Sequence, residues 1–356
     1  MPLSAAFLRL ESVATLILLA VLVLPVLLYL WTGWEIRRSE IFGTMSNRGV
    51  QLYFRQFFPA RTTSTADPME EFRRHYHHLY GRQQFIGPLV LMVAVAVVLL
   101  GLAVRTAVGW LSGTTVSPAL PPIAVAAVAG AYMWIATDLI SRCRRRALAP
   151  VDLYWSALRL IIAIPVGFAF AGIFKDEAGA PMAFALGAFP TRTLITVIRR
   201  VASRRLGLSE SGEGPQAELE KLQGITPGNA ERFSDEDIST ILQLAYADPV
   251  DLTIRTSFSF NYVVDCVSQA LAWIYFEDTL AKLRACSLRG AYEIYTLFRD
   301  LDGDDPLAAE VARAMIACVA AEVGQKPVVF EETLRQVAGD PYTEFNYAIW
   351  NVADEE

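Results

Sequence analysis

The sequence has few of the residues that most often carry catalysis or bind metals. It contains three histidines and four cysteines among 356 residues. The histidines His75, His77 and His78 all fall in one short stretch, so a Ser–His or Cys–His dyad is excluded from the C-terminal part of the chain. The sequence also lacks a phosphate-binding glycine-rich loop with its lysine, a dinucleotide fingerprint, a His-Glu-x-x-His motif and a nucleophile elbow. These absences predict a protein that is not an enzyme and holds no cofactor.

The four cysteines do not show the paired spacing of a disulfide framework or a zinc site. Three of them, Cys266, Cys286 and Cys318, lie on apolar, helix-like stretches, where a free cysteine is a common small core residue. The fourth, Cys143, stands alone. This usage favours a reducing compartment and disfavours a disulfide among them.

Alternating, strand-like runs are rare, whereas long apolar runs are common, and 54% of the residues are hydrophobic. Residues 1–205 hold 21 Lys and Arg against 10 Asp and Glu, a net charge of +11, and contain every long apolar run. Residues 206–356 hold 10 against 27, a net charge of −17. We therefore expect an all-α protein: a transmembrane domain at 1–205 with a long basic cytosolic loop at 35–85, a linker at 206–215, and an acidic all-α domain at 216–356.

A membrane-spanning helix needs about 20 mostly apolar residues. The first candidate is long and lacks a small-residue cleavage site, so it is interpreted as a retained anchor. The last one is interrupted by Pro190 and Arg192. The five candidate spans are Val13–Trp34, Ile86–Val108, Pro121–Ile140, Leu158–Phe174 and Ala180–Ile198.

Basic residues alternate between the segments that join these spans. The segment after the first span holds eight arginines, and basic runs also follow the third and fifth spans, whereas 106–120 has no Lys or Arg. Because cytosolic loops carry the excess of positive charge, five spans with the N-terminus outside and the C-terminus in the cytosol satisfy the pattern. The location indicated is the plasma (inner) membrane. A re-entrant fifth span would instead place the acidic domain outside.

Two charges, Asp138 and Arg192, are predicted to lie inside spans. Charges in hydrocarbon are costly and usually face a partner or a cavity. Three interpretations remain open: an Asp138–Arg192 pair, two side chains that reach back to the inner interface, and an ion pathway.

The third span also carries small residues four apart, Ala126 with Gly130 and Ala127 with Ala131. Such pairs let helix backbones approach closely in lipid. They favour packing within the chain, with a homo-oligomer as the alternative.

The long basic loop interleaves aromatic residues and arginines, as in Tyr53-Phe54-Arg55. This pattern is typical of contact with an anionic leaflet. His75 and His78, one helical turn apart, could share a metal, but the cationic surroundings oppose one. The residues predicted to contact lipid headgroups are Arg55, Arg73, Arg74, Arg144, Arg145 and Arg146.

The acidic domain opens with the sequence Leu-Gln-Gly-Ile-Thr-Pro-Gly-Asn-Ala over residues 222–230. Two glycines, Gly224 and Gly228, flank Ile225, and Ala230 lies in the next helix. Over about 40 residues this pattern resembles a helix-hairpin-helix (SAM-like) domain, and the whole chain resembles uncharacterised polytopic membrane proteins of bacteria. The resemblance implies a turn that binds DNA phosphates or another protein. A domain of net charge −17 would repel phosphates, so a protein partner is favoured and nucleic acid is disfavoured.

Farther along, Phe260–Phe276 is apolar but is interrupted by Asp265 and Gln269, so it is predicted to be a buried core helix rather than a sixth span. The acidic run Asp302–Asp305 departs from the calcium-loop pattern and is interpreted as a capping turn before Pro306. The acidic residues Asp235–Asp237 and Asp302–Asp305 would meet a basic partner or the chain's own Arg142–Arg146.

Taken together, these patterns predict a membrane scaffold, sensor or signalling protein that presents an acidic helical interaction domain at the inner membrane face. The alternative is an oligomeric channel or transporter gated by that domain. Membrane-tethered nucleic-acid binding is a third, less favoured class.

Overall fold

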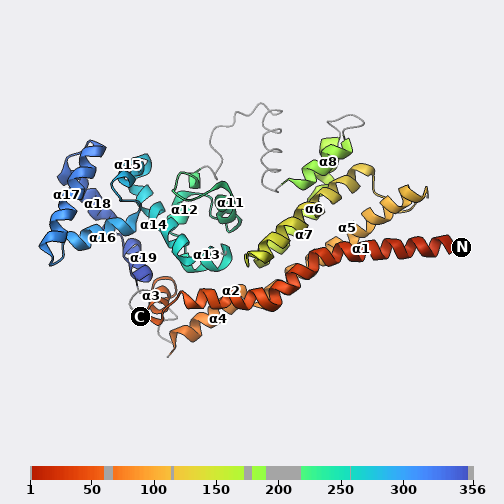
Figure 1. Ribbon diagram of the computed structural model, residues 1–356, viewed down its shortest axis with the longest axis horizontal. Coiled ribbons are helices and arrows are strands. Elements are labelled where there is room, and N and C mark those ends of the chain that lie inside the picture. Colours follow the sequence, from red (N-terminus) through yellow and green to blue (C-terminus); the bar gives the residue numbers. More distant parts are fainter. Residues whose placement is uncertain are drawn as a thin grey trace. The chain divides into compact units, whose positions relative to one another are not determined.

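The structure, a computed structural model, describes residues 2–59, 67–113, 116–171, 179–189, 218–256 and 258–351. These ranges are helical and contain no strand (Figure 1), which confirms the all-α prediction. The chain divides into two compact units. The first, here called the membrane unit, comprises Met1–Arg38 and His77–Ser211. The second, called the composite unit, comprises Ser39–Tyr76 and Gly212–Glu356.

The membrane unit contains four helices that are long and apolar enough to cross a membrane. The third and fourth of these helices begin at prolines, Pro122 and Pro150, and the segments that join the second, third and fourth helices are short. Its elements are α1 (Pro2–Leu28), the π-helical turn η1 (Tyr29–Gly33), the start of α2 (Trp34–Gly43), the end of α4 (Pro68–Tyr80), the 3-10 turn η2 (Arg82–Phe85), α5 (Ile86–Ser112), α6 (Pro122–Arg144), α7 (Pro150–Ala171) and α8 (Gly179–Ala188).

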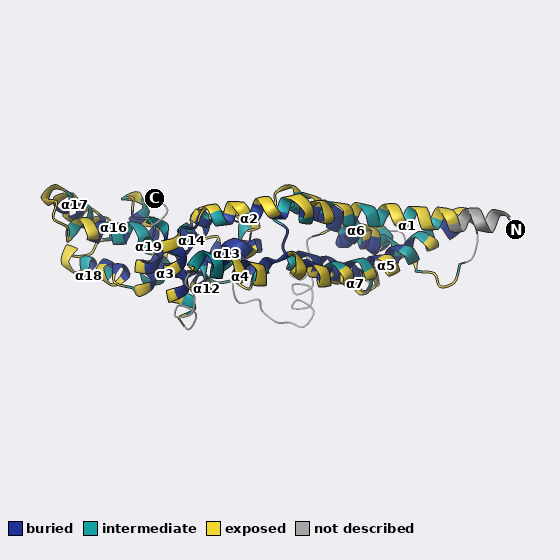
Figure 2. Ribbon diagram, turned by 90° about the horizontal axis from the view of Figure 1, so that it is seen from below, coloured by how far each residue is buried: buried dark blue, intermediate teal, exposed yellow. Residues whose placement is uncertain are grey.

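The long helices bury a narrow face and expose a wide apolar one (Figure 2). On α5, Met92, Ala96 and Leu100 recur every four residues and are at most 2% exposed, whereas Val98 is 58% exposed. A water-soluble helix bundle would not leave such faces uncovered. The pattern is the one expected when lipid is the solvent.

The predicted spans agree with these helices at several boundaries and differ at two. The second and third helices begin at Ile86 and Pro122. The fourth begins at Pro150, eight residues before the predicted Leu158, because proline opens a helix well and the polar residues after it lie on a buried face. Of the predicted fifth span, α8 covers the first part up to Ala188, and residues 190–198 lie outside the described ranges.

Helices α6 and α8 approach each other at two glycines. A Cβ atom placed on Gly130 would stand 2.1 Å from the carbonyl oxygen of Phe184, and one on Gly187 would stand 2.3 Å from that of Ala127. Only a residue without a side chain allows this backbone contact. The small residues of the third span therefore pack within the chain, as the favoured interpretation predicted.

The composite unit joins the segment between the first two spans to the C-terminal part of the chain. At its centre, α14 has eleven buried residues, which confirms the prediction of a core helix over Phe260–Phe276. Its elements are the end of α2, α3 (Asn47–Phe57), the start of α4, α11 (Pro227–Asp235), α12 (Ile241–Ala245), α13 (Pro249–Thr256), α14 (Phe260–Phe276), η4 (Glu277–Thr279), α15 (Leu280–Ala285), α16 (Ala291–Leu301), α17 (Pro306–Val323), α18 (Pro327–Ala338) and α19 (Pro341–Asn351).

The structure places Ser39–Tyr76 in the composite unit. The predicted domain boundary instead assigns the whole loop at 35–85 to the transmembrane domain. Tyr53 and Phe54 on α3 are 0% and 4% exposed. The ring of Phe57 packs against Tyr342 and Phe345 of α19, with centroids 6.0 and 5.5 Å apart. The aromatic side of the loop is therefore protein core and not a lipid-facing surface.

Local capping follows the sequence closely in the same unit. The Asp305 carboxylate accepts a hydrogen bond of 2.9 Å from the backbone N–H of Leu307, directly before Pro306 in the first turn of α17. This confirms the interpretation of the acidic run as a helix cap. Asp302 instead pairs with Arg335 of α18 at 3.0 Å.

Candidate functional site

The predicted interaction turn of the composite unit leads into α11. Gly224 adopts a φ of +84°, which glycine tolerates best, and the Thr226 hydroxyl caps α11 by accepting from the N–H of Asn229 at 3.3 Å. Ile225 and Ala230 are buried, at 6% and 0% exposure. Gly228 is exposed, with open space where a side chain would stand. Of the four predicted turn residues, two are therefore core and two shape the surface.

The turn is held against α14 by side chains that bond its backbone. The amide of Gln269 accepts from the N–H of Gln223 at 2.9 Å and donates to its carbonyl at 3.1 Å. The hydroxyl of Tyr262 donates to the carbonyl of Gly224 at 3.0 Å and accepts from Asn229 at 2.7 Å. These bonds fix the backbone of the turn against α14 and suit a rigid structural turn.

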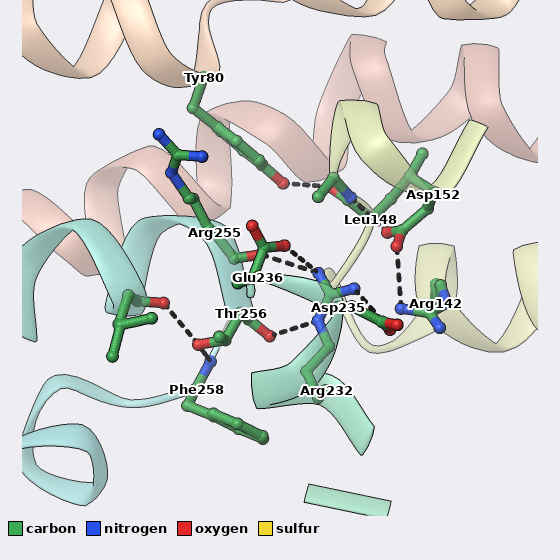
Figure 3. A network of polar contacts seen from close by, with 12 residues as sticks. Tyr80, Arg142, Leu148, Asp152, Arg232, Asp235, Glu236, Arg255, Thr256 and Phe258 are labelled. Atoms are coloured by element: carbon green, nitrogen blue, oxygen red, sulfur yellow. Dashed lines mark hydrogen bonds and ion pairs between the residues drawn. The ribbon is translucent and has the colours of Figure 1, made fainter. Parts of the chain in front are cut away.

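A buried arginine lies on α11, the helix into which the turn leads (Figure 3). Arg232 of α11 is 8% exposed, and its guanidinium donates to the carbonyls of Thr256 at 3.1 Å and Arg255 at 2.8 Å, at the end of α13. The carboxylates of Asp235 and Glu236 lie 3.9 and 4.0 Å from it. These two carboxylates therefore balance an internal charge, which corrects the expectation that they form a solvated acidic face.

A second polar chain joins the two sequence segments of the composite unit. The hydroxyl of Tyr53 donates to Asp248 Oδ2 at 2.9 Å, and Nε2 of His75 lies 3.2 Å from the same hydroxyl. Because the tyrosine proton goes to Asp248, the tyrosine oxygen accepts from His75, which requires the Nε2–H tautomer. Of the two histidines weighed above as a metal pair, His75 contacts the hydroxyl of Tyr53 and His78 is exposed.

Asp248 is electrostatically unusual. Although part of the residue reaches solvent, the protein packed around its carboxyl raises its pKa to about 7, against hydrogen bonds from Asp251, Tyr53 and Val250 that favour the charged form. Burial also raises the pKa of Tyr53 well above its usual range, and the nearby Asp248 charge adds to this effect. Within the described residues, no group of three or more His, Cys, Asp and Glu side chains could hold a metal.

In the membrane unit, Asp138 has a partner on its own helix. Its Oδ2 lies 2.7 Å from Nε of Arg142, whose Nη1 lies 3.1 Å from Oδ1 of Asp152 (Figure 3). The other oxygen of Asp152 accepts from the backbone N–H of Ala149 at 2.7 Å. This ties the end of α6 to the start of α7. The predicted partner of Asp138, Arg192, lies outside the described residues.

The structure also reveals an intramembrane charge that the sequence analysis missed. Arg159 of α7 is 5% exposed, donates to the carbonyl of Gly187 at 2.7 Å, and stands over the ring of Trp134 at 4.3 Å. The signal was present, because Arg159 is the second residue of the predicted fourth span. It was overlooked because Arg159 stands at the predicted start of the span, where a long basic side chain ordinarily reaches the membrane interface.

The arginines predicted to contact lipid headgroups are at the surface. Those of the loop segment lie on the exposed sides of α3 and α4, where Arg73 and Arg74 also pair with Glu70 at 3.2 and 3.9 Å. The others end α6 or follow it. All six, Arg55, Arg73, Arg74, Arg144, Arg145 and Arg146, are exposed.

No protein-family model, curated protein or solved structure matches this chain.

Proposed function

We propose that this protein is an integral membrane scaffold that presents a helical protein-interaction domain at the cytosolic face of the plasma (inner) membrane. The observation that carries the proposal is the composite unit, in which Ser39–Tyr76 folds with Gly212–Glu356. A domain built from two segments is connected to the membrane helices at three points of the chain. Such a domain is anchored more firmly than one on a single flexible linker, as suits a platform for another protein.

The two chain segments that form the composite unit also constrain the membrane topology. Residues 39–76 and 212–356 must lie on the same side of the membrane, since they share one core. The chain between them must therefore cross an even number of times, and α5, α6 and α7 supply three crossings. We assign the fourth to the stretch that begins with α8, which is the predicted fifth span. The eight arginines of residues 35–85 favour the cytosol for this side, because cytosolic loops carry the excess of positive charge.

The proposed surface for a partner is the exposed part of the turn and the acidic cap of α17. Gly228, Asp237 and Asp304 are exposed, and the C-terminal part of the chain carries a net charge of −17. A basic protein surface fits this charge. The exposed arginines of α3, α4 and the end of α6 would contact anionic lipid headgroups.

Co-purification from the native host's membranes in mild detergent tests the proposal. The wild type should bring down a stoichiometric partner that Gly228→Arg or Asp304→Arg loses, because both changes alter the exposed surface and leave the core intact. Glu332→Arg, on an exposed position of α18, is the matched control and should keep the partner. A protein that purifies alone, or a partner retained by both variants, would reject this surface.

An oligomeric channel or transporter gated by the composite unit is the alternative function. The buried Arg159 and the Asp138–Arg142–Asp152 chain favour it, since ionisable groups inside membrane helices often mark ion pathways. Each of these groups has a partner in the structure, however, as structural charges do. Ion flux into liposomes that contain the purified protein would separate the two functions.

A further inference from the structure

Two cysteines that are 32 residues apart in the sequence meet in the composite unit. Cys286 follows α15 directly, and Cys318 lies in the second half of α17. Their sulfur atoms are 3.9 Å apart. Both thiols are free, Cys318 is exposed, and Cys286 is half-buried. The other two cysteines, Cys143 and Cys266, have no such neighbour among the contacts of the described residues.

We propose that Cys286 and Cys318 are an oxidative modification site, a dithiol that a peroxide or a small-molecule disulfide converts reversibly into an intramolecular disulfide. The backbone supports this chemistry. Cys286 stands at the C-terminal end of α15, and the next residue, Ser287, has a φ of +66° and leaves the helix. A side chain at a helix end can rotate more freely than one packed inside a helix, so the sulfurs can close from 3.9 Å to bonding distance with a small movement.

The chemistry balances with a peroxide as the oxidant. The more exposed thiolate, Cys318, attacks one peroxide oxygen, which gives a sulfenic acid and releases water or an alcohol. Cys286 then attacks that sulfur and displaces the hydroxyl group as a second water. Two thiols and one peroxide thus become one disulfide, with the peroxide reduced by two electrons. A small dithiol reverses the step by thiol–disulfide exchange and is itself oxidised to a disulfide.

The pKa of the Cys286 thiol determines how the rate of disulfide formation depends on pH. Burial, the hydrogen bond with Cys318 and the charge of Glu322 all raise the pKa of the Cys286 thiol. Only the thiolate is a strong nucleophile. Because Cys286 is the nucleophile of the second step, closure of the disulfide should be slow at neutral pH and faster in alkali, by up to about tenfold for each pH unit below the pKa of that thiol.

Such a disulfide would close a loop that contains α16. Loop closure restricts the unfolded chain and stabilises the folded one. In turn, α16 packs against α17, α18 and α19, so oxidation would stiffen the part of the composite unit formed by these helices. The inference is independent of the proposed scaffold function, because it rests on the two thiols alone.

The full-length protein in detergent, treated with hydrogen peroxide and digested without reduction, tests the proposal. Mass spectrometry should find the Cys286 and Cys318 peptides joined, two hydrogens lighter than the sum of the separate peptides, and separated again by a dithiol. The oxidised protein should melt about 5 °C higher than the reduced one. The joined peptide should form faster at pH 9 than at pH 7.

Cys286→Ser and Cys318→Ser should each abolish the joined peptide and the melting shift, whereas the double variant Cys143→Ser/Cys266→Ser should keep both. If either single variant misfolds, the corresponding alanine variant and thiol counting on the native protein replace it. Four thiols that survive peroxide unchanged, a disulfide that joins other cysteines, or a link between two copies of the chain would each overturn the proposal.

Discussion

Two apolar helices, α5 in the membrane unit and α14 in the composite unit, differ in where their side chains lie. In α5, Val90 and Val98 are 62% and 58% exposed, as expected of a helix that faces lipid. In α14, Val263, Val267 and Leu271 are 0% exposed. Hydrophobicity alone does not separate the two, because both lipid and a protein core accept apolar surface.

The difference lies in the polar residues that interrupt α14. Asp265 pairs with Arg289, and Gln269 bonds the backbone of Gln223 in both directions. Both of these polar side chains therefore bind another part of the same unit, which a lipid-facing helix cannot offer. An apolar run of 17 residues with polar interruptions thus indicates a protein core, and an uninterrupted apolar run such as residues 86–104 of α5 indicates a membrane span.

The strongest way to break this comparison is to remove the residue that joins the two segments of the composite unit. Tyr53→Ala deletes a side chain that is 0% exposed and makes the hydrogen bond to Asp248, so it should destabilise the unit by about 3–5 kcal/mol. Tyr53→Phe, the matched control, removes only the hydroxyl and should cost about 1–2 kcal/mol. Hydrogen exchange of the full-length protein should show faster exchange in α13 and α19. Unchanged exchange there would mean that residues 39–76 fold separately.

A pH series should sharpen the contrast, because the composite unit contains a buried acid. The pKa of Asp248 is about 7 in the folded state and lies near 3.8 when unperturbed. Between these values the folded state binds more protons, so this group's contribution to stability is full below about pH 4 and is lost as the pH rises towards 7. The loss is on the order of 4 kcal/mol. Asp248→Asn should flatten the pH dependence of thermal unfolding, and an equal slope in both proteins would contradict the assignment.

In the membrane unit, a comparable test targets backbone packing. Gly130→Ala places a methyl group 2.1 Å from the carbonyl oxygen of Phe184 and should cost about 1–3 kcal/mol of thermal stability in detergent. Gly101→Ala in α5, where nothing lies within 4 Å of the added carbon, should be neutral or slightly stabilising. Equal melting temperatures for the two variants would show that α6 and α8 do not meet at Gly130.

Breaking single ion pairs should have the smallest effects on stability, and the effect should be larger in the membrane unit than in the composite unit. Asp302→Asn breaks an exposed pair with Arg335 and should change stability by less than about 1 kcal/mol. Asp138→Asn breaks a half-buried pair with Arg142 and should lower yield and melting temperature more clearly. If Asp138→Asn instead changes ion flux into liposomes while assembly is intact, the result supports the channel function and contradicts the scaffold function.

Features that depend on neighbouring residues in the sequence were predicted well. The bounds of α14, the start of α5 at Ile86 and the cap at Asp305 follow from apolar periodicity, helix breakers and capping chemistry. The membrane character follows from composition alone. These signals are local, so the chain carries them whatever the rest of the molecule does.

The candidate sites were harder, because they depend on partners far away in the sequence. Tyr53 and Phe57 among arginines look like a lipid-facing surface until Asp248 is placed beside Tyr53, and Tyr342 and Phe345 beside Phe57. The meeting of Cys286 with Cys318 is likewise invisible in any local window. The sequence places Arg159 inside a predicted span but does not show the carbonyl of Gly187 and the ring of Trp134 that it contacts.

By itself, the sequence determined that this is a helical membrane protein whose C-terminal part is acidic, and which stretches are helices. Only the tertiary structure decided that the loop after the first span belongs to the C-terminal part, that Asp138 pairs with Arg142, and which cysteines meet. The physical reason is that an amphipathic pattern shows which face of a helix will be buried. It does not show what will cover that face, because apolar burial is non-directional and many surfaces could satisfy it.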